Sequence, residues 1–495
     1  MANRSKSAKR DEIYSKKIRN RLILIPSIAL IIKIFIIMRI QGFNWFAAGG
    51  NDVVKGLTGL LDNNYTPAHI WYGADGENYL RGLVALARDG FLSTDGKLSY
   101  WPAGYPLLMW PLLIILKGWF FFGLAIIQSF IYAVACVFFV DELRKSRLAK
   151  FALPVALILT FNPTVALNTI AIGYEIPAVA LILIAVGAMM RNIRTLKSKI
   201  LSSELLIASL SLLISTLMQP RLIVFAIVIF LVWGLAKYRP LTALQLISVG
   251  LVIVAIAPAT MILRNSQANG YATISTNLGT TMGIGAGPEA TGGYNGKYNG
   301  VPCPASESAV NPAKADSAKI KCILKWYWEN PGSALKLTWN KSIYFWSPWF
   351  GPVANGTMAR NPWRINHPLA ETVKTESGFK MVYGTGGKLV SWTWMILNLA
   401  VMFYGFTLLW RSGNVERLLS LVALLIVLLN WASAIATIGD HRFRIPSMGM
   451  SLFLQVVGFT ALFIKKTRRF SGSPIPISWP GLRWKRPTQT DNLPS

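Results

Sequence analysis

Two carboxylates near the start of the chain, Asp75 and Glu77, precede a segment whose apolar residues recur at helical intervals. An acid at the beginning of a helix has two explanations. It can cap the helix and interact favourably with the helix dipole, which stabilises a helix by about 1 kcal/mol. It can instead act as a general base that takes a proton from an incoming hydroxyl or amine. The local sequence leaves both explanations open. The apolar positions are Leu80, Leu83, Val84, Leu86 and Ala87.

A third acid, Glu175, lies in a very short turn that has apolar residues on both sides. An ionisable group at the boundary of a membrane indicates a functional site, because burying it there is costly. The alternative is a structural ion pair with an arginine such as Arg221. The sequence does not choose between these two roles.

Five cations in turns between apolar stretches are candidates for binding a phosphate. The forked guanidinium of arginine suits a phosphate group. In a turn that connects two membrane spans, such a phosphate would belong to a lipid headgroup. For any single arginine the alternative is contact with ordinary phospholipid at the membrane surface. Two arginines in one short turn favour a specific role for at least one of them. The candidates are Arg221, Arg264, His441, Arg442 and Arg444.

The composition is that of a polytopic membrane protein. Of 495 residues, 53% are hydrophobic and only 14% are charged. The formal charge of +29 could suggest nucleic acid, but much of it lies in short runs that flank apolar spans, as membrane topology requires. Nucleic acid is therefore excluded as the expected partner, and a bilayer with anionic or phosphorylated lipids is expected instead.

About ten apolar segments are long enough to be transmembrane helices, which need roughly 20 residues. Basic residues follow every second span, which places all of these basic turns on one side of the membrane. By the positive-inside rule this side is the cytoplasm, so both termini are expected there. The predicted spans are 22–40, 120–140, 151–167, 176–190, 205–217, 222–236, 241–263, 389–410, 418–438 and 445–464.

These spans predict an all-α architecture in five parts. We expect the first outside loop, 41–118, to lie within the transmembrane module and to hold the carboxylates Asp75 and Glu77. The basic N-terminus is interpreted as a retained signal-anchor, since no cleavage site follows it. The parts are a cytoplasmic N-terminus (1–21), a transmembrane module (22–263), an extracytoplasmic section of mixed structure (264–388), C-terminal spans (389–464) and a basic cytoplasmic tail (465–495).

The segment 105–116 is expected to lie along the membrane surface, as a juxtamembrane helix, and not to cross the bilayer. Its two prolines and the preceding Gly104 interrupt a spanning helix. Counting it as a span would also move the basic turns 144–150 and 191–199 to the outside, against the charge pattern.

The extracytoplasmic section carries three further signals. Cys303 and Cys322 are candidates for a disulfide, whereas Cys136 is expected to be packed within a span. The glycine-dense segment 277–294 has no dinucleotide-binding context and is interpreted as an irregular loop close to a ligand. No His, Cys or Asp residues have the spacing of metal ligands, although the sequence leaves a requirement for a divalent metal open.

This layout resembles the GT-C superfamily of glycosyltransferases that use polyprenyl-phosphate sugars. It is similar in particular to bacterial members such as protein O-mannosyltransferases and the lipid A aminoarabinose transferase. The resemblance rests on the order and placement of short motifs in the first 260 residues and the last spans. They are the run Asp75–Tyr79, the segment 102–106, Glu175, the pair 220–221 and the turn 442–446.

The resemblance implies an inverting sugar transfer on the extracytoplasmic face of the plasma (inner) membrane. Asp75 would be the general base and Glu175 a second carboxylate of the site, while Tyr79 and the cations named above would bind the donor. The chain has Gly76 between Asp75 and Glu77, so which of these two acids takes the proton stays open. The donor would be a polyprenyl-phosphate sugar, and the acceptor a lipid-linked glycan, an envelope polysaccharide or a protein.

Two other functions remain as alternatives. A ligase or polymerase of lipid-linked glycans would use a lipid-diphosphate donor. A transporter or flippase would also need many spans and buried charges, although transporters often have internal repeats with paired broken helices, which this sequence lacks.

Overall fold

The computed structural model describes residues 20–35, 53–62, 76–162, 164–165, 168–195, 200–295, 300–347, 376–377 and 384–463. All regular elements within these ranges are helical, with no β-strand, which confirms the all-α prediction. Asp75, most of the basic N-terminus and the tail 465–495 lie outside the described residues, as do parts of the two long sections 41–118 and 264–388.

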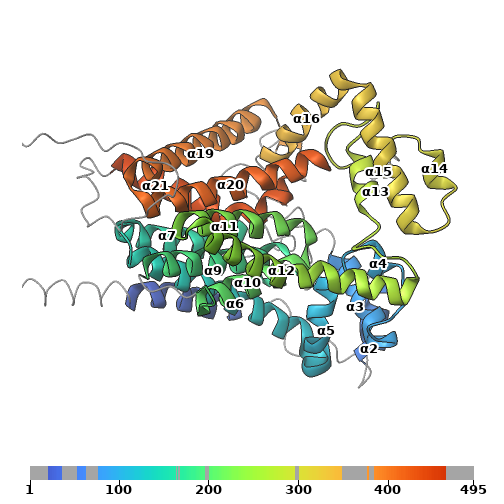
Figure 1. The fold of residues 1–495 in the computed structure, drawn as a ribbon, viewed down its shortest axis with the longest axis horizontal. Coiled ribbons are helices and arrows are strands. Elements are labelled where there is room, and N and C mark those ends of the chain that lie inside the picture. The colour runs from blue at the N-terminus through green and yellow to red at the C-terminus, as the bar shows by residue number, and fades with distance from the viewer. Residues whose placement is uncertain are drawn as a thin grey trace, which may run out of the picture.

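Long apolar helices form a bundle whose axes run mostly along the long dimension of the molecule (Figure 1). Each helix satisfies its own backbone hydrogen bonds, which allows apolar stretches to pack side by side without polar partners for the backbone. They are the helix 20–35, α6 (Phe120–Arg144), α7 (Ala149–Phe161), α9 (Glu175–Arg194), α10 (Ser203–Met218), α11 (Ile223–Lys237), α12 (Pro240–Asn269), α19 (Thr385–Ser412), α20 (Asn414–Ala436) and α21 (Met448–Phe463).

Seven helical segments of the described chain are long and apolar enough to cross a membrane. The helices α7 and α10 are apolar but have only 13 and 16 residues. The seven are Gly104–Arg144, Glu175–Arg194, Pro220–Lys237, Pro240–Asn269, Thr385–Ser412, Val415–Ala436 and His441–Phe463. A multi-pass membrane protein follows from these segments, while the count of about ten spans stays a prediction.

The segment predicted to lie along the membrane surface forms α5 (Gly104–Leu116). A break separates it from α6, because Lys117 has a positive φ of 46° and begins the short 3₁₀ helix η2 (Lys117–Trp119). By length and composition, α5 and α6 together form one continuous apolar segment, Gly104–Arg144. The break lets α5 lean away from the bundle axis, as Figure 1 shows.

Basic residues gather at one end of the bundle. Arg194, at the end of α9, forms an ion pair with Glu142 and donates to the Glu142 carbonyl oxygen at 3.0 Å, which joins the ends of α9 and α6. Lys237, at the end of α11, donates to Asn192 Oδ1 at 3.0 Å. The inner turns predicted from the charge pattern therefore do lie together.

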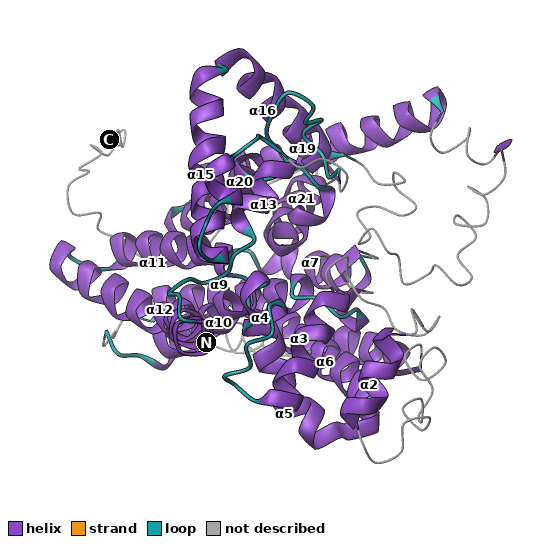
Figure 2. Cartoon of the chain, turned by 90° about the vertical axis from the view of Figure 1, so that its right-hand side faces the viewer, coloured by secondary structure: helices purple, strands orange, loops and turns teal. Residues whose placement is uncertain are grey.

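Smaller helices cover the opposite end of the bundle. Two groups lie on different sides of this end, with α2–α5 below and α13–α16 above in both views (Figures 1 and 2). The lower group comprises α2 (Val53–Asp62), α3 (Gly76–Asp89), α4 (Lys97–Tyr100) and α5. The upper group, called here the α13–α16 section, comprises α13 (Leu278–Ile284), α14 (Pro304–Glu307), α15 (Pro312–Glu329) and α16 (Pro331–Trp346).

A disulfide between Cys303 and Cys322 joins the start of α14 to α15, which confirms the predicted pair. Cys136 is buried within α6, also as predicted.

A buried lysine attaches the α13–α16 section to the bundle. Lys341 is 1% exposed, and its ammonium donates to Tyr327 Oη and to the Ile435 carbonyl oxygen, both at 2.9 Å. Tyr327 Oη in turn donates to the Gly285 carbonyl oxygen at 3.2 Å. Among the described residues no carboxylate lies within 4 Å of this ammonium. Burial lowers the pKa of Lys341 to about 8 and raises that of Tyr327 to about 12.

Lys341 makes the stability of the protein depend on alkaline pH. The pKa of Lys341 falls from 10.5 in the unfolded chain to about 8 in the folded protein. Between pH 8 and 10.5 this lysine is therefore protonated in the unfolded chain and largely neutral in the folded protein. Stability therefore rises with pH across this window, by roughly 3 kcal/mol at most. We expect the unfolding temperature of detergent-purified protein to rise less between pH 8 and 10 in Lys341→Met than in the wild type. The exposed Lys336→Met is the control and keeps the wild-type slope; equal slopes in all three proteins would contradict the prediction.

Candidate functional site

An acid and an arginine from distant parts of the chain meet at the end of the bundle opposite the basic turns. Glu175 is the first residue of α9 and is 3% exposed, so its carboxylate lies where the helix dipole favours negative charge. Its Oε1 lies 3.9 Å from Nε of Arg442. Arg442 comes from the 3₁₀ helix η6 (His441–Ser447), where its backbone N–H donates to the Asp440 side chain at 2.8 Å.

A second guanidinium lies beside this pair. Arg221, in the 3₁₀ helix η4 (Pro220–Leu222) between α10 and α11, donates from Nη2 to Tyr174 Oη at 2.9 Å. Its Cζ lies 4.4 Å from the ring centre of Phe443, and Cζ of Arg442 lies 5.3 Å from the same ring. The two guanidiniums thus contact the same aromatic ring, and such cation–π contacts stabilise charge in a water-poor setting.

The charge in this part of the bundle is not balanced within the described residues. Glu175 pairs with Arg442, whereas Arg221 contacts the neutral aromatic side chains of Tyr174 and Phe443. The Nε of Arg221 is also buried and donates to none of the described residues. A half-buried guanidinium with a buried, unused Nε and no carboxylate within ion-pair distance among the described residues favours the binding of an anion.

A buried tyrosine cluster connects this charged group to the lower helices. The ring of Tyr79, one turn into α3, lies 5.3 Å from Tyr105 in α5 and 6.4 Å from Tyr174, both in edge-to-face contact. Tyr105 Oη donates to Gln128 Oε1 at 2.9 Å and accepts from the Gly173 N–H at 3.2 Å. The cluster therefore fixes the turn that immediately precedes Glu175.

Close contact between helices also depends on Gly104, the first residue of α5. A Cβ atom at this position would lie 1.7 Å from the Leu217 carbonyl oxygen at the end of α10. Any side chain there would push α5 away from α10 and so move Tyr105 from its hydrogen bonds. The motif 102–106 thus has a packing role that places the tyrosine cluster.

Of the two acids near the start of α3, the structure describes Glu77 and not Asp75. Glu77 lies in the first turn of α3, and its carboxylate, 41% exposed, accepts from Nε of Arg81 at 3.1 Å. Arg81 also donates to the Leu61 carbonyl oxygen at 3.1 Å, which ties α3 to α2. This arrangement gives Glu77 a structural ion pair. Asp75 lies outside the described residues, which begin again at Gly76.

Two of the predicted phosphate ligands make other contacts. Arg264 is fully buried in α12 and donates to the carbonyl oxygens of Phe91 and Ser93, so it secures the loop that follows α3. Arg444 donates to the Ser347 carbonyl oxygen at 3.1 Å and contacts the sulfur of Met395 at 3.6 Å. These hydrogen bonds give Arg264 and Arg444 a role in holding the backbone of neighbouring segments.

The other predicted residues gather at one place. Tyr79, Arg221 and Arg442 surround the turn that carries Glu175, as the contacts above show. His441 is buried next to Arg442, and its Nδ1 lies 3.5 Å from Asp440 Oδ1.

Two buried amides that hold the site were not identified from the sequence. Gln128 of α6 donates from Nε2 to the Ala171 carbonyl oxygen at 3.1 Å, in the turn before Glu175. Asn430 of α20 donates from Nδ2 to the Phe443 carbonyl oxygen at 2.6 Å and to Ser447 Oγ at 3.0 Å. A lone amide within an otherwise apolar span was the available signal, because such a group must find a partner inside the bundle.

The described residues contain no group of three or more His, Cys, Asp or Glu side chains that could hold a metal ion. The chemistry that the arrangement itself offers is the binding of an anion beside a buried carboxylate.

The pair of Glu175 and Arg442 should be coupled energetically. Removing one partner leaves the other charge buried, which typically costs about 3–5 kcal/mol. We therefore expect Glu175→Gln and Arg442→Met each to lower the unfolding temperature, and the double variant to lower it by less than the sum. Combining Glu175→Gln with Arg417→Met, a change at an exposed residue in the first turn of α20, is the control and should be additive. Additive effects in both combinations would show that the two charges do not interact.

Comparison of the chain with protein-family models, with curated proteins and with solved structures found no match.

Proposed function

We propose that the protein is a membrane glycosyltransferase that moves a sugar from a polyprenyl-phosphate donor to an extracytoplasmic acceptor. The observation that carries the proposal is the group formed by Glu175, Arg442 and Arg221 at one end of an apolar bundle. A carboxylate and two guanidiniums at a membrane boundary suit a reaction in which a lipid phosphate is the leaving group.

The position of this group supports a lipid substrate. The helix α9 has 20 residues and so is about 30 Å long, close to the thickness of the hydrocarbon core. Glu175 stands at its first residue and Arg194 at its last, among the basic turns. If those turns face the cytoplasm, as the positive-inside rule predicts, Glu175 and its arginines lie at the level of the outer headgroups. This is the basis for assigning the site to the extracytoplasmic face.

The proposed reaction is a single displacement with inversion. Asp75 removes the proton of an acceptor hydroxyl, and the oxygen attacks the anomeric carbon of the donor sugar. The bond between that carbon and the phosphate oxygen breaks, and the polyprenyl phosphate leaves with the bonding electrons. Arg221 and Arg442 stabilise the charge that grows on the phosphate, while the tyrosine cluster positions the start of α3, next to Asp75.

The first test concerns the base. We expect Asp75→Asn to abolish transfer from a polyprenyl-phosphate sugar while expression and folding persist, since the amide cannot take a proton. Glu77→Gln should retain activity, because Glu77 already forms the ion pair with Arg81. The measurement is release of polyprenyl phosphate by protein reconstituted in liposomes, followed by mass spectrometry. An active Asp75→Asn with an inactive Glu77→Gln would move the base to Glu77.

The second test concerns the arginines. Arg442→Lys keeps the charge but removes the forked donors, so transfer should fall by about 10²-fold, as for other preorganised groups that stabilise developing charge. The matched control is Arg417→Lys, an exposed arginine at the start of α20 that should leave transfer unchanged. Equal activity of both variants would remove Arg442 from the site.

The same assays separate the alternatives. Turnover of a lipid-diphosphate donor with no use of a lipid-monophosphate sugar would indicate a ligase or polymerase. Uptake of a solute into the liposomes without transfer would indicate a transporter. Comparing envelope glycans by mass spectrometry with and without the gene would identify the sugar and the acceptor.

A further inference from the structure

The helix α16 has a buried face and a second, apolar face that the described part of the chain leaves exposed. Leu337, Lys341 and Phe345 recur every four residues and are buried against the bundle. A second stripe, Leu335, Trp339 and Ile343, has the same spacing but is 73%, 68% and 39% exposed. An uncovered apolar stripe on an otherwise packed helix indicates a surface that something else covers.

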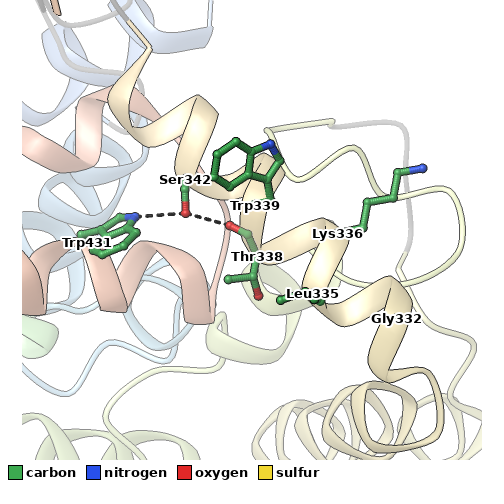
Figure 3. Close-up of a pocket in the computed structure, with 7 residues that line it drawn as sticks. All are labelled: Gly332, Leu335, Lys336, Thr338, Trp339, Ser342 and Trp431. Carbon is green, nitrogen blue, oxygen red and sulfur yellow. Dashed lines mark hydrogen bonds between the residues drawn. The ribbon is translucent and has the colours of Figure 1, made fainter. Parts of the chain in front are cut away.

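Beside this stripe lies a hollow of about 680 Å³, within the range of ligand pockets. Figure 3 shows Trp339 and Trp431 on either side of Ser342, with Lys336 pointing outward at the rim. The hollow is bounded by α16 on one side and by the end of α20 on the other. It is lined by Gly332, Leu335, Lys336, Thr338, Trp339, Ser342 and Trp431.

The polar groups between the two tryptophans are already hydrogen-bonded within the protein. Trp431 Nε1 donates to Ser342 Oγ at 3.2 Å, and Ser342 Oγ donates to the Thr338 carbonyl oxygen at 2.8 Å. An occupant of the hollow therefore meets mainly the apolar surface of two tryptophans and a leucine, with the ammonium of Lys336 at the rim. This favours a hydrocarbon chain over a sugar, which would need unused donors and acceptors.

The location of the hollow points to a lipid of the bilayer. Trp431 lies in the apolar segment Val415–Ala436, five residues before its end, so the hollow continues from the surface of a candidate membrane span. Tryptophan at such a boundary is typical of the membrane interface.

The positive charge around the hollow favours a lipid with an anionic headgroup. Residues 312–346 contain six lysines and two acidic residues, and Lys336 is exposed at the rim of the hollow. Lysines close to a membrane surface attract anionic lipids.

We propose that this hollow binds the hydrocarbon chain of an anionic phospholipid, with the lipid phosphate at Lys336. The α16 helix then rests on the bilayer surface through Leu335, Trp339 and Ile343. This inference does not depend on the proposed sugar transfer. The hollow nevertheless lies close to the candidate site, since Trp431 packs in one buried cluster with Phe443, the ring that Arg221 and Arg442 contact.

The test is photochemical labelling of the whole protein in nanodiscs that contain phosphatidylglycerol with a diazirine in its acyl chain. Peptide mass spectrometry should find label on α16 and around Trp431. The double variant Leu335→Asp/Trp339→Asp should reduce labelling of α16 by about tenfold, because aspartate is costly in hydrocarbon. Trp328→Asp on α15, where the indole is 88% exposed, is the matched control and should leave labelling of α16 unchanged.

Headgroup selection is tested with the same diazirine chain on phosphatidylcholine. We expect stronger labelling by phosphatidylglycerol, and loss of this preference in Lys336→Glu but not in Lys325→Glu, which makes the same charge change on α15. Equal labelling by both lipids would overturn the role of Lys336. Absence of label on α16 in protein whose spans are labelled, or equal labelling of the double variant and the wild type, would overturn the lipid site itself.

Discussion

The arrangement of this protein depends on keeping polar groups satisfied inside an apolar bundle. Water cannot supply partners in the hydrocarbon region, so every buried charge and amide needs one from the protein. Glu175 illustrates the constraint, because its carboxylate is 3% exposed and faces Arg442, 267 positions along the chain. The turn before it is held by Gln128 and Tyr105, and the backbone after Arg442 is held by Asn430. Five helices, α5, α6, α9, α20 and η6, must therefore assemble before this carboxylate can be buried.

The helices themselves could be predicted because their signals are local. Apolar length and flanking charge placed α6, α9, α12 and α20 within a few residues of their observed ends. The prolines and Gly104 predicted that the segment 105–116 lies apart from the span 120–140, but they did not predict the form of the break, which is a positive φ at Lys117 and a 3₁₀ turn. The short length of α7 was not predicted, since apolar residues continue past the point where the helix ends.

The site could be predicted only in part, because its pairings are not local. The sequence placed Arg221 and Arg442 in turns at the same end of the bundle, and the structure brings both to one phenylalanine ring. It suggested Arg221 as a structural partner of Glu175, whereas the ion pair is with Arg442 and Arg221 bonds to the neighbouring Tyr174. Arg264 looked equally suitable, yet its donors secure the loop after α3. An arginine in a turn carries no sequence signal that separates these roles, because each depends on which backbone carbonyls fold beside it.

The two ends of the bundle accommodate buried positive charges in different ways. At the basic end, Arg194 has the carboxylate of Glu142 and Lys237 has the oxygens of Asn192, so these charges are matched by groups of the protein. At the other end, the guanidinium of Arg221 lies against aromatic rings, and among the described residues the ammonium of Lys341 donates to a phenol and a carbonyl oxygen, with no carboxylate beside it. Aromatic rings stabilise a cation without neutralising it. An end built in this way retains positive charge that can attract an anion, and this property supports the proposal that the candidate site binds the phosphate of a lipid.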